Sequence, residues 1–293
     1  MKTLIVFVGM FVFAGAVQTA PSASEKVLGA TKNGVVLIAA HRGGYTDDVA
    51  DQAPENSVAN VAVAIHKGYD VFETDIQRTS DGVFVAVHDP TLERETDGSG
   101  EAKDLTLAQL KSLKKRYRDG TLSGERVATL EELLLAGKGK ILFKPDLKPG
   151  VIDHFDQLAR LIKKLGMQDQ VFIRTGMENF KVIQAYFEGG GVKVEVMFKV
   201  KKLKQLKSVI KTFHPKTVQV DLREGEGISN ERKAVIREAV RSGLLVETHA
   251  YKDSTQWAEL ADLGVRMFHT KKPDVMLVYL KDNGWRKGEK FEG

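Results

Sequence analysis

The chain of 293 residues contains no cysteine. Without thiols it can form neither a disulfide framework nor an acyl-anchored lipoprotein terminus, so its stability must come from a packed core. Proline is scarce as well, with seven residues, and no linker, low-complexity tract or clear repeat divides the chain. A chain of this length with 42% hydrophobic residues can bury a large core, and we expect one main domain.

Charge of one sign is not in large excess either. The formal net charge of +5 suits anionic substrates or surfaces only weakly. The lysine-rich stretch 199–207 carries its apolar residues at helical spacing, which indicates a solvated helix face. We therefore expect no nucleic-acid partner, and no feature of the sequence indicates an obligate protein partner.

The amino terminus has the three regions of a secretory signal. Lys2 precedes an apolar run at 4–13, and small residues follow up to position 24. The run is short for a membrane anchor and has no stop-transfer flank, so we predict a cleaved signal over 1–24 and a mature domain over 25–293. Ala-Gly-Ala at 14–16 and Ala-Pro-Ser at 20–22 both permit cleavage. The expected protein is exported, periplasmic or secreted, and has no stable membrane anchor.

From position 35 onward, short β-branched runs alternate with amphipathic stretches of helical length, which is typical of a parallel sheet wrapped by helices. The predicted strands are 35–40, 71–77, 83–87, 141–147, 171–174, 192–198, 217–221, 244–248 and 265–269. The predicted helices are 57–67, 107–115, 130–135, 154–165, 178–186, 203–213, 231–242 and 254–263.

One of the nine strands is surplus to an eight-stranded barrel. Asp81-Gly82 alone separates 71–77 from 83–87, and two residues can join antiparallel strands but cannot provide a parallel crossover. The run 83–87 is therefore an added hairpin strand. The other eight fit a TIM-type (β/α)8 barrel, an α/β fold.

Four polar clusters stand at the ends of predicted strands, where barrel enzymes place catalytic groups. They are His-Arg-Gly-Gly at 41–44, Glu-Thr-Asp at 73–75, His-Asp at 88–89 and Asp-Leu-Lys at 146–148. Glu73 and Asp75 are two positions apart in a strand, so both carboxylates project from one face. An oxygen-rich pair of this kind suits calcium or magnesium better than zinc.

The hairpin predicts a further neighbour for these carboxylates. A two-residue turn pairs Ser80 with Val83 and, counting outward, pairs Asp75 with His88, with the two residues within about 5.5 Å. Taken alone, each cluster has an ordinary structural interpretation: a strand-to-helix turn, an exposed sheet edge, a capped loop or a surface pair. Their common order on successive elements favours a functional site.

In order and spacing, these motifs closely resemble those of the glycerophosphodiester phosphodiesterase family. The resemblance rests on His-Arg-Gly at 41–43, Pro-Glu-Asn-Ser at 54–57, Glu-x-Asp at 73–75, the turn 79–82 leading to His-Asp, and Thr-Leu-Glu-Glu at 129–132. It implies a phospholipase C-like (PLC-like) phosphodiesterase architecture. It also implies metal-dependent hydrolysis of a small glycerophosphodiester to an alcohol and glycerol 3-phosphate, with water or the substrate's own glycerol hydroxyl as nucleophile.

The resemblance further implies a role for each site residue. The acid–base pair would be His41 and His88. The ligands of a divalent ion, Ca²⁺ or Mg²⁺, would be Glu73, Asp75 and Asp146. The two phosphate-binding residues and the supporting residue near His41 would be Arg42, Lys148 and Glu55.

Three segments depart from the family pattern. Asp146 stands where the family has glutamate in Glu-x-Lys, the Trp-Thr-Val-Asn segment has no match at 247–251, and the closing Thr-Asp-x-Pro reads Thr-Lys-Lys-Pro at 270–273. His249 and His269 end late strands, and either packing or substrate contact fits them. Other functions remain open: a lysophospholipase D-like or sphingomyelinase D-like enzyme, which accepts an acyl chain, or a non-catalytic phosphodiester-binding barrel. Turnover would exclude the binder.

Overall fold

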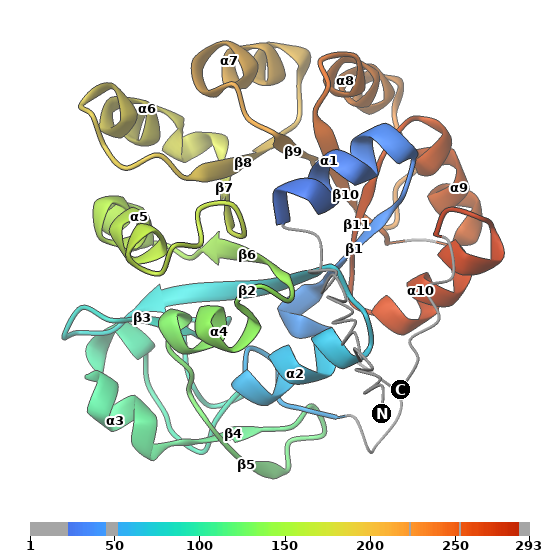
Figure 1. Cartoon of the computed structure of the whole chain (residues 1–293). Coiled ribbons are helices and arrows are strands. Elements are labelled where there is room, and N and C mark those ends of the chain that lie inside the picture. Colours follow the sequence, from blue (N-terminus) through green and yellow to red (C-terminus); the bar gives the residue numbers. More distant parts are fainter. Residues whose placement is uncertain (1–22, 45–51, 223, 252, 287–293) are drawn as a thin grey trace, which may run out of the picture.

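The computed structural model describes residues 23–44, 52–222, 224–251 and 253–286, in which eight parallel strands close into a barrel (Figure 1). Around the ring the order is β1 (Leu37–Ala40), β11 (Met267–Thr270), β10 (Leu245–His249), β9 (Thr217–Val220), β8 (Glu195–Val200), β7 (Phe172–Gly176), β6 (Leu142–Leu147) and β2 (Val71–Arg78). Pairing of β1 with β2 closes the ring. This arrangement confirms the predicted TIM-type barrel.

Helices surround the barrel and cover the outer face of its strands (Figure 1). They are α2 (Val58–His66), α4 (Leu130–Gly137), α5 (Phe155–Lys164), α6 (Phe180–Glu188), α7 (Leu203–Phe213), α8 (Asn230–Arg241), α9 (Ser254–Asp262) and α10 (Pro273–Asp282). The core between strands and helices contains the fully buried rings of Phe72, Phe143, Phe198 and Phe268. No helix in the described part of the chain is long and apolar enough to cross a membrane.

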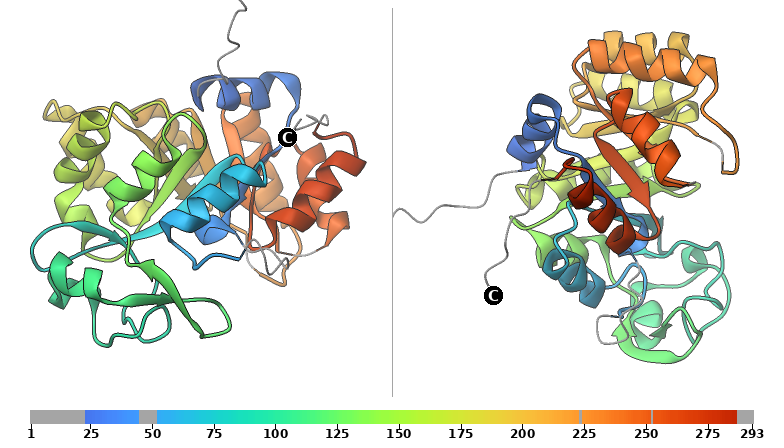
Figure 2. Two further views of the ribbon diagram at one scale, coloured as in Figure 1. Left: turned by 60° about the horizontal axis from the view of Figure 1, so that its bottom comes forward. Right: turned by 90° about the vertical axis from the view of Figure 1, so that its right-hand side faces the viewer.

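A helix that was not predicted, α1 (Ala23–Asn33), closes the end of the barrel at which the strands begin (Figure 2). Val27 and Ala30 of this helix pack against residues inside the barrel, such as Leu37 and Val71. The opposite end is left open for the predicted site. The predicted signal boundary after position 24 falls within α1, and residues 1–22 lie outside the described residues.

Between β2 and α4 the chain makes an excursion with a small core of its own (Figure 2). It contains β3 (Phe84–Ala86), η3 (Ala102–Asp104), α3 (Leu107–Ser112), β4 (Lys114–Arg116) and β5 (Leu122–Arg126). The β4–β5 hairpin was not predicted, and the predicted helix 107–115 ends early. The chain is extended at Lys115, and this conformation places the fully buried Lys115 ammonium 3.4 Å from the Glu95 carboxylate. The helix therefore ends before Lys115.

The β2–β3 hairpin forms as predicted, but its register differs by one residue. Ile76 pairs with Ala86 and Arg78 with Phe84, so the predicted pairing of Asp75 with His88 is wrong. The turn contains three residues rather than two, because the Thr79 hydroxyl accepts a hydrogen bond from the Val83 amide and the backbone amide of Thr79 donates to the Val83 carbonyl.

Other elements: η1, η4 and η5

Three short 3-10 turns complete the strand-to-helix connections near the open end of the barrel. They are η1 (His41–Gly43), η4 (Val151–His154) and η5 (Met177–Asn179). Each follows the carboxyl end of a barrel strand: η1 follows β1, η4 follows β6 and η5 follows β7. The loops that carry functional groups in a barrel enzyme lie at this end.

Candidate active site

The carboxyl ends of β1, β2 and β6 bring the predicted site residues together at the open end of the barrel. His41 directly follows β1, Glu73 and Asp75 lie in β2, and Asp146 lies in β6. The neighbouring strand pairs place Asp75 opposite Asp146. Contacts described below connect these residues with the rest of the predicted set: Arg42, Glu55, His88 and Lys148. The roles assigned to the eight residues stay predictions.

The turn after β1 points the Arg42 backbone toward the cluster of carboxylates. Arg42 has φ 53° and ψ 34°, a left-handed conformation that is uncommon outside glycine, and its amide donates a 2.8 Å hydrogen bond to Glu73 Oε2. Gly43 follows with φ +88°, where a Cβ would lie 2.3 Å from the Asn60 amide and 2.5 Å from the Phe72 ring. Position 43, the last of the His-Arg-Gly motif, therefore requires glycine.

The segment Pro-Glu-Asn-Ser at 54–57 supports the same turn. The Arg42 guanidinium donates to both Glu55 oxygens, at 3.1 and 3.2 Å, and its Nε lies 3.5 Å from Asp75 Oδ2. The Asn56 side chain donates to Asp75 and accepts from the Thr74 hydroxyl. One loop therefore orients both the guanidinium and the carboxylate.

Three carboxylates form a cluster that fits a divalent cation. Glu73 and Asp75 are only 3% and 2% exposed, and one oxygen from each lies within 4.8 Å of one from Asp146. Burial together with the negative charge of Glu73 raises the pKa of Asp75 to about 7, against the opposing effect of Lys148, whose Nζ lies 2.8 Å away. A cation with oxygen preference would relieve this concentration of negative charge.

Glu73 remains ionised in the same cluster. Burial alone would raise its pKa, but the contact with His269 and the positive charge of Lys144 outweigh burial and hold the pKa well below the usual range. The carboxylate is therefore available as a ligand at neutral pH.

Arg174, at the end of β7, was missed by sequence reasoning. Its Nη1 lies 2.6 Å from Asp146 Oδ1, and its Nε donates to Gln219. Burial opposes the charge of Arg174, yet the neighbouring Asp146 raises the guanidinium pKa. The two residues are brought together only by pairing of β6 with β7, so no local motif could have indicated the contact.

His88 is held by a network of charged residues in the excursion. Its Nδ1 lies 2.6 Å from Asp89 Oδ1, and the backbone amides of His88 and Asp89 both donate to Glu95. Arg94 donates to Asp89 and, at 2.7 Å, to Glu55. Sequence reasoning missed Arg94 and Glu95, although their charges a few positions beyond His-Asp were a weak signal.

The rings of the two predicted catalytic histidines lie edge to face, at an interplanar angle of 78°. Their ring centroids are 6.5 Å apart. Burial lowers the pKa of His41 to about 3, against the charge of Glu73, and burial also lowers the pKa of His88, against its hydrogen bond to Asp89. Both rings are therefore neutral at pH 7 in the free protein, and each can accept a proton.

His249 and His269 extend this pair into a row of rings across the barrel mouth. The His269 ring centroid is 5.1 Å from that of His41 and 4.5 Å from that of His249, and Tyr251 stacks on His249 at 4.7 Å. His269 is 7% exposed, and its Nε2 lies 3.5 Å from Glu73 Oε2. The sequence left open what His269 contacts. In the structure it contacts Glu73, a predicted metal ligand.

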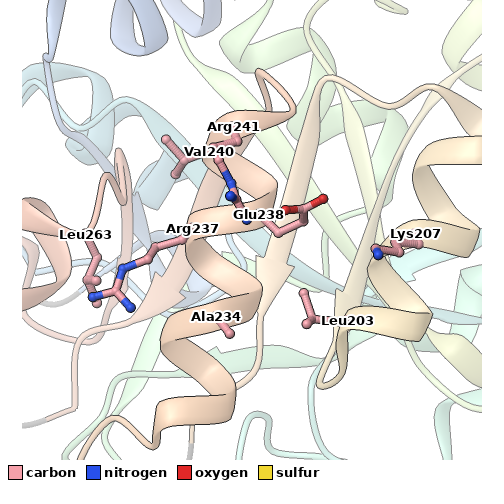
Figure 3. A pocket seen from close by; sticks show the side chains of 8 residues that line it. All are labelled: Leu203, Lys207, Ala234, Arg237, Glu238, Val240, Arg241 and Leu263. Carbon is pink, nitrogen blue, oxygen red and sulfur yellow. Dashed lines mark hydrogen bonds and ion pairs between the residues drawn. The ribbon is translucent and has the colours of Figure 1, made fainter.

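Two cavities flank Lys148. One of about 440 Å³ is lined by His88 and Lys148, and one of about 390 Å³ is lined by Asp146, Lys148 and Arg174. A separate hollow of about 610 Å³ between α7 and α8 contains none of the predicted site residues (Figure 3).

Comparison with known proteins agrees with this geometry. A glycerophosphodiester phosphodiesterase from Caldanaerobacter subterraneus is 34% identical over 142 residues, which is 47% of this chain. The chain spans only 56% of that protein's own length, little more than half. One from Bacillus subtilis is 27% identical over 268 residues, covering 82% of this chain and 85% of the relative.

Solved structures show the same fold. A glycerophosphoryl diester phosphodiesterase from Parabacteroides distasonis superposes with a TM-score of 0.71 at 22% identity, covering 85% of this chain and 87% of that one. An Oleispira antarctica phosphodiesterase in complex with its product sn-glycerol-3-phosphate gives a TM-score of 0.65 at 18% identity, covering 85% and 98%. The profile of the Glycerophosphoryl diester phosphodiesterase family matches residues 41–275, and the chain belongs to this family.

Proposed function

We propose that the chain is a metal-dependent hydrolase that cleaves glycerophosphodiesters to an alcohol and glycerol 3-phosphate. The observation that carries the proposal is the placement of two histidine rings, 6.5 Å apart, beside a buried cluster of three carboxylates. Family membership and the product bound to the Oleispira relative support the choice of substrate.

The carboxylate cluster supports calcium or magnesium as the resident ion. Its three side chains, Glu73, Asp75 and Asp146, offer oxygen atoms alone, which is the donor set that these ions prefer. A bound ion would polarise the phosphoryl oxygens and neutralise charge that develops on them. Arg42 and Lys148 border the cluster, and they would hold the remaining phosphate oxygens as a planar fork and a point charge.

The surroundings of the two histidines support different roles in proton transfer. His41 is neutral, so it is free to accept a proton. His88 contacts Asp89, which stabilises the protonated ring and fixes its orientation. His41 accepts a proton from the attacking water as the new P–O bond forms. His88 must take up a proton before the reaction, and Asp89 stabilises the protonated ring. The P–O bond to the alcohol breaks as His88 gives this proton to the departing oxygen. The proton on His41 then returns to solvent, and His88 is protonated again before the next turnover.

The experiment that tests the proposal is a measurement of glycerol 3-phosphate release by the purified chain. Glycerophosphocholine, other glycerophosphodiesters, lysophosphatidylcholine and sphingomyelin serve as substrates, each with chelator, calcium, magnesium or manganese. We expect release from glycerophosphodiesters that chelator abolishes. Cleavage of lysophosphatidylcholine or sphingomyelin alone would replace the substrate class, and binding with no turnover would make the chain a non-catalytic barrel.

We also propose that the protein is exported. Support comes from Lys2 and the apolar run 4–13, which small residues follow. The test is amino-terminal sequencing of protein recovered from the periplasm or medium of an expressing bacterium. Recovery of uncleaved chain from the cytoplasm alone would contradict export.

A further inference from the structure

Three donor side chains from neighbouring strands converge beside the carboxylate cluster. His41 follows β1, Glu73 lies in β2 and His269 lies in β11, and these strands are adjacent in the ring. One donor atom from each residue lies within 4.8 Å of the other two. Since Glu73 also belongs to the oxygen-rich cluster, two distinct donor sets share one carboxylate.

The nitrogen atoms of this set are buried without hydrogen-bond partners. Both ring nitrogens of His269 and the Nδ1 of His41 lack a hydrogen-bond partner among the residues that the structure describes. The His269 residue is 7% exposed. Nε2 of His269 faces Glu73 Oε2 at 3.5 Å. Buried polar atoms that lack a partner cost stability, and such an exception calls for a ligand.

We propose that His41, Glu73 and His269 form a second cation site, which takes a transition-metal dication such as Zn²⁺. Two imidazoles and one carboxylate favour such an ion over calcium or magnesium, which prefer oxygen alone. Zinc sites that keep an open position have three protein ligands of this kind, with bonds of about 2.0–2.2 Å.

An ion in this site inhibits the hydrolysis, because one nitrogen of His41 then binds the cation while the other carries the ring's own hydrogen, and the ring has no lone pair left to accept a proton. This consequence rests on the proposed function, whereas binding of the ion does not. Tyr251 and His249 continue the row of rings beyond His269, but neither belongs to the donor set. His249 is therefore a matched control: a neighbouring imidazole outside the site.

The binding test uses the full purified chain in excess Mg²⁺, which fills the oxygen-rich cluster. Zinc affinity is measured by competition with a chromogenic chelator for the parent, His269→Phe and His249→Phe, and thermal unfolding checks that each variant is folded. We expect one tightly bound zinc ion in the parent and in His249→Phe, and an affinity at least about tenfold lower in His269→Phe. Equal affinity in His269→Phe and the parent would overturn the site.

Two further measurements keep the site testable if His269→Phe fails to fold. X-ray absorption at the zinc edge of the parent should show about two imidazole ligands, and coordination by oxygen alone would overturn the assignment. Zinc should also inhibit glycerol 3-phosphate release by the parent more than by a folded His269→Gln variant, each relative to its own zinc-free rate. Equal inhibition would refute the site. If no metal supports hydrolysis, the proposed function fails, and zinc affinity still decides the site.

Discussion

Arg174 Nη1 lies 2.6 Å from Asp146 Oδ1, so a guanidinium contacts one of the three carboxylates predicted to bind the metal ion. Lys148 Nζ likewise lies 2.8 Å from Asp75 Oδ1, so a second cation contacts a second carboxylate of the cluster. Two cationic side chains thus border the carboxylates that would hold the ion.

The third carboxylate is the ligand that departs from the family pattern, and its contribution can be measured directly. Asp146→Ala should lower the affinity for calcium or magnesium by about 10–100-fold, because the cluster loses one of three anionic donors. Asp146→Glu should keep measurable binding. Calorimetric titration of chelator-treated protein gives the affinities, with the exposed Asp153→Ala as control. A parent-like titration of Asp146→Ala would show that another residue fills the position.

Metal binding should depend on pH through Asp75. Its pKa is raised to about 7 in the folded chain, so below pH 7 the carboxyl holds a proton that the ion must displace. The affinity should therefore fall by up to about tenfold per pH unit below 7 and level off above it. Calorimetry in two buffers of different ionisation enthalpy should show release of about one proton per ion at pH 6 and almost none at pH 8. No proton release at pH 6 would contradict the shift.

The barrel could be predicted from the sequence because each strand carries its own local signal. The predicted strands, such as 217–221, are short and β-branched, and segments with helical periodicity separate them. Their number and order therefore follow without knowledge of tertiary contacts. The eight predicted site residues stand in short motifs, seven in or directly after strands and Glu55 before the first barrel helix, and the fold brings these segments together. Their roles stay predictions.

The features that were missed depend on particular contacts, one within a turn and two between residues distant in the chain. The hairpin register is set by hydrogen bonds between Thr79 and Val83, which lengthen the turn by one residue. The helix over 107–115 is cut short because Lys115 is buried against Glu95. Arg174 meets Asp146 only through strand pairing. Local sequence patterns do not indicate these interactions, because each forms only when folding brings the partner residue close.

A buried ion pair inside the barrel gives a prediction about stability. The Lys144 ammonium lies 2.6 Å from the Glu247 carboxylate, and both side chains are fully buried. Glu247→Ala should lower the free energy of unfolding by about 3–5 kcal/mol, because the ammonium is left buried without its partner. The double variant Lys144→Met, Glu247→Leu should recover much of this loss. Chemical denaturation measures both, with the surface variant Arg160→Ala as a control that should leave stability unchanged.

The last prediction concerns the two histidines assigned to proton transfer. Positioned acid or base groups contribute about 10²–10⁴-fold, so His41→Ala and His88→Ala should each lower turnover by that order while folding and binding of calcium or magnesium persist. Asp89→Asn should lower turnover less, since the ring of His88 stays in place but loses the carboxylate that stabilises its protonated form. His66→Ala, at an exposed histidine at the end of α2, serves as control.

The combination of the two substitutions tests whether the histidines act in one reaction. Residues that work as a unit are not additive, so the double variant should be far less impaired than the product of the single effects. Initial rates of glycerol 3-phosphate release, with metal occupancy checked for every variant, provide the comparison. Near-parent turnover in a folded, metal-loaded His88→Ala variant would remove the acid from the mechanism. In the parent, Asp89 and Arg94 would then orient a ring that transfers no proton.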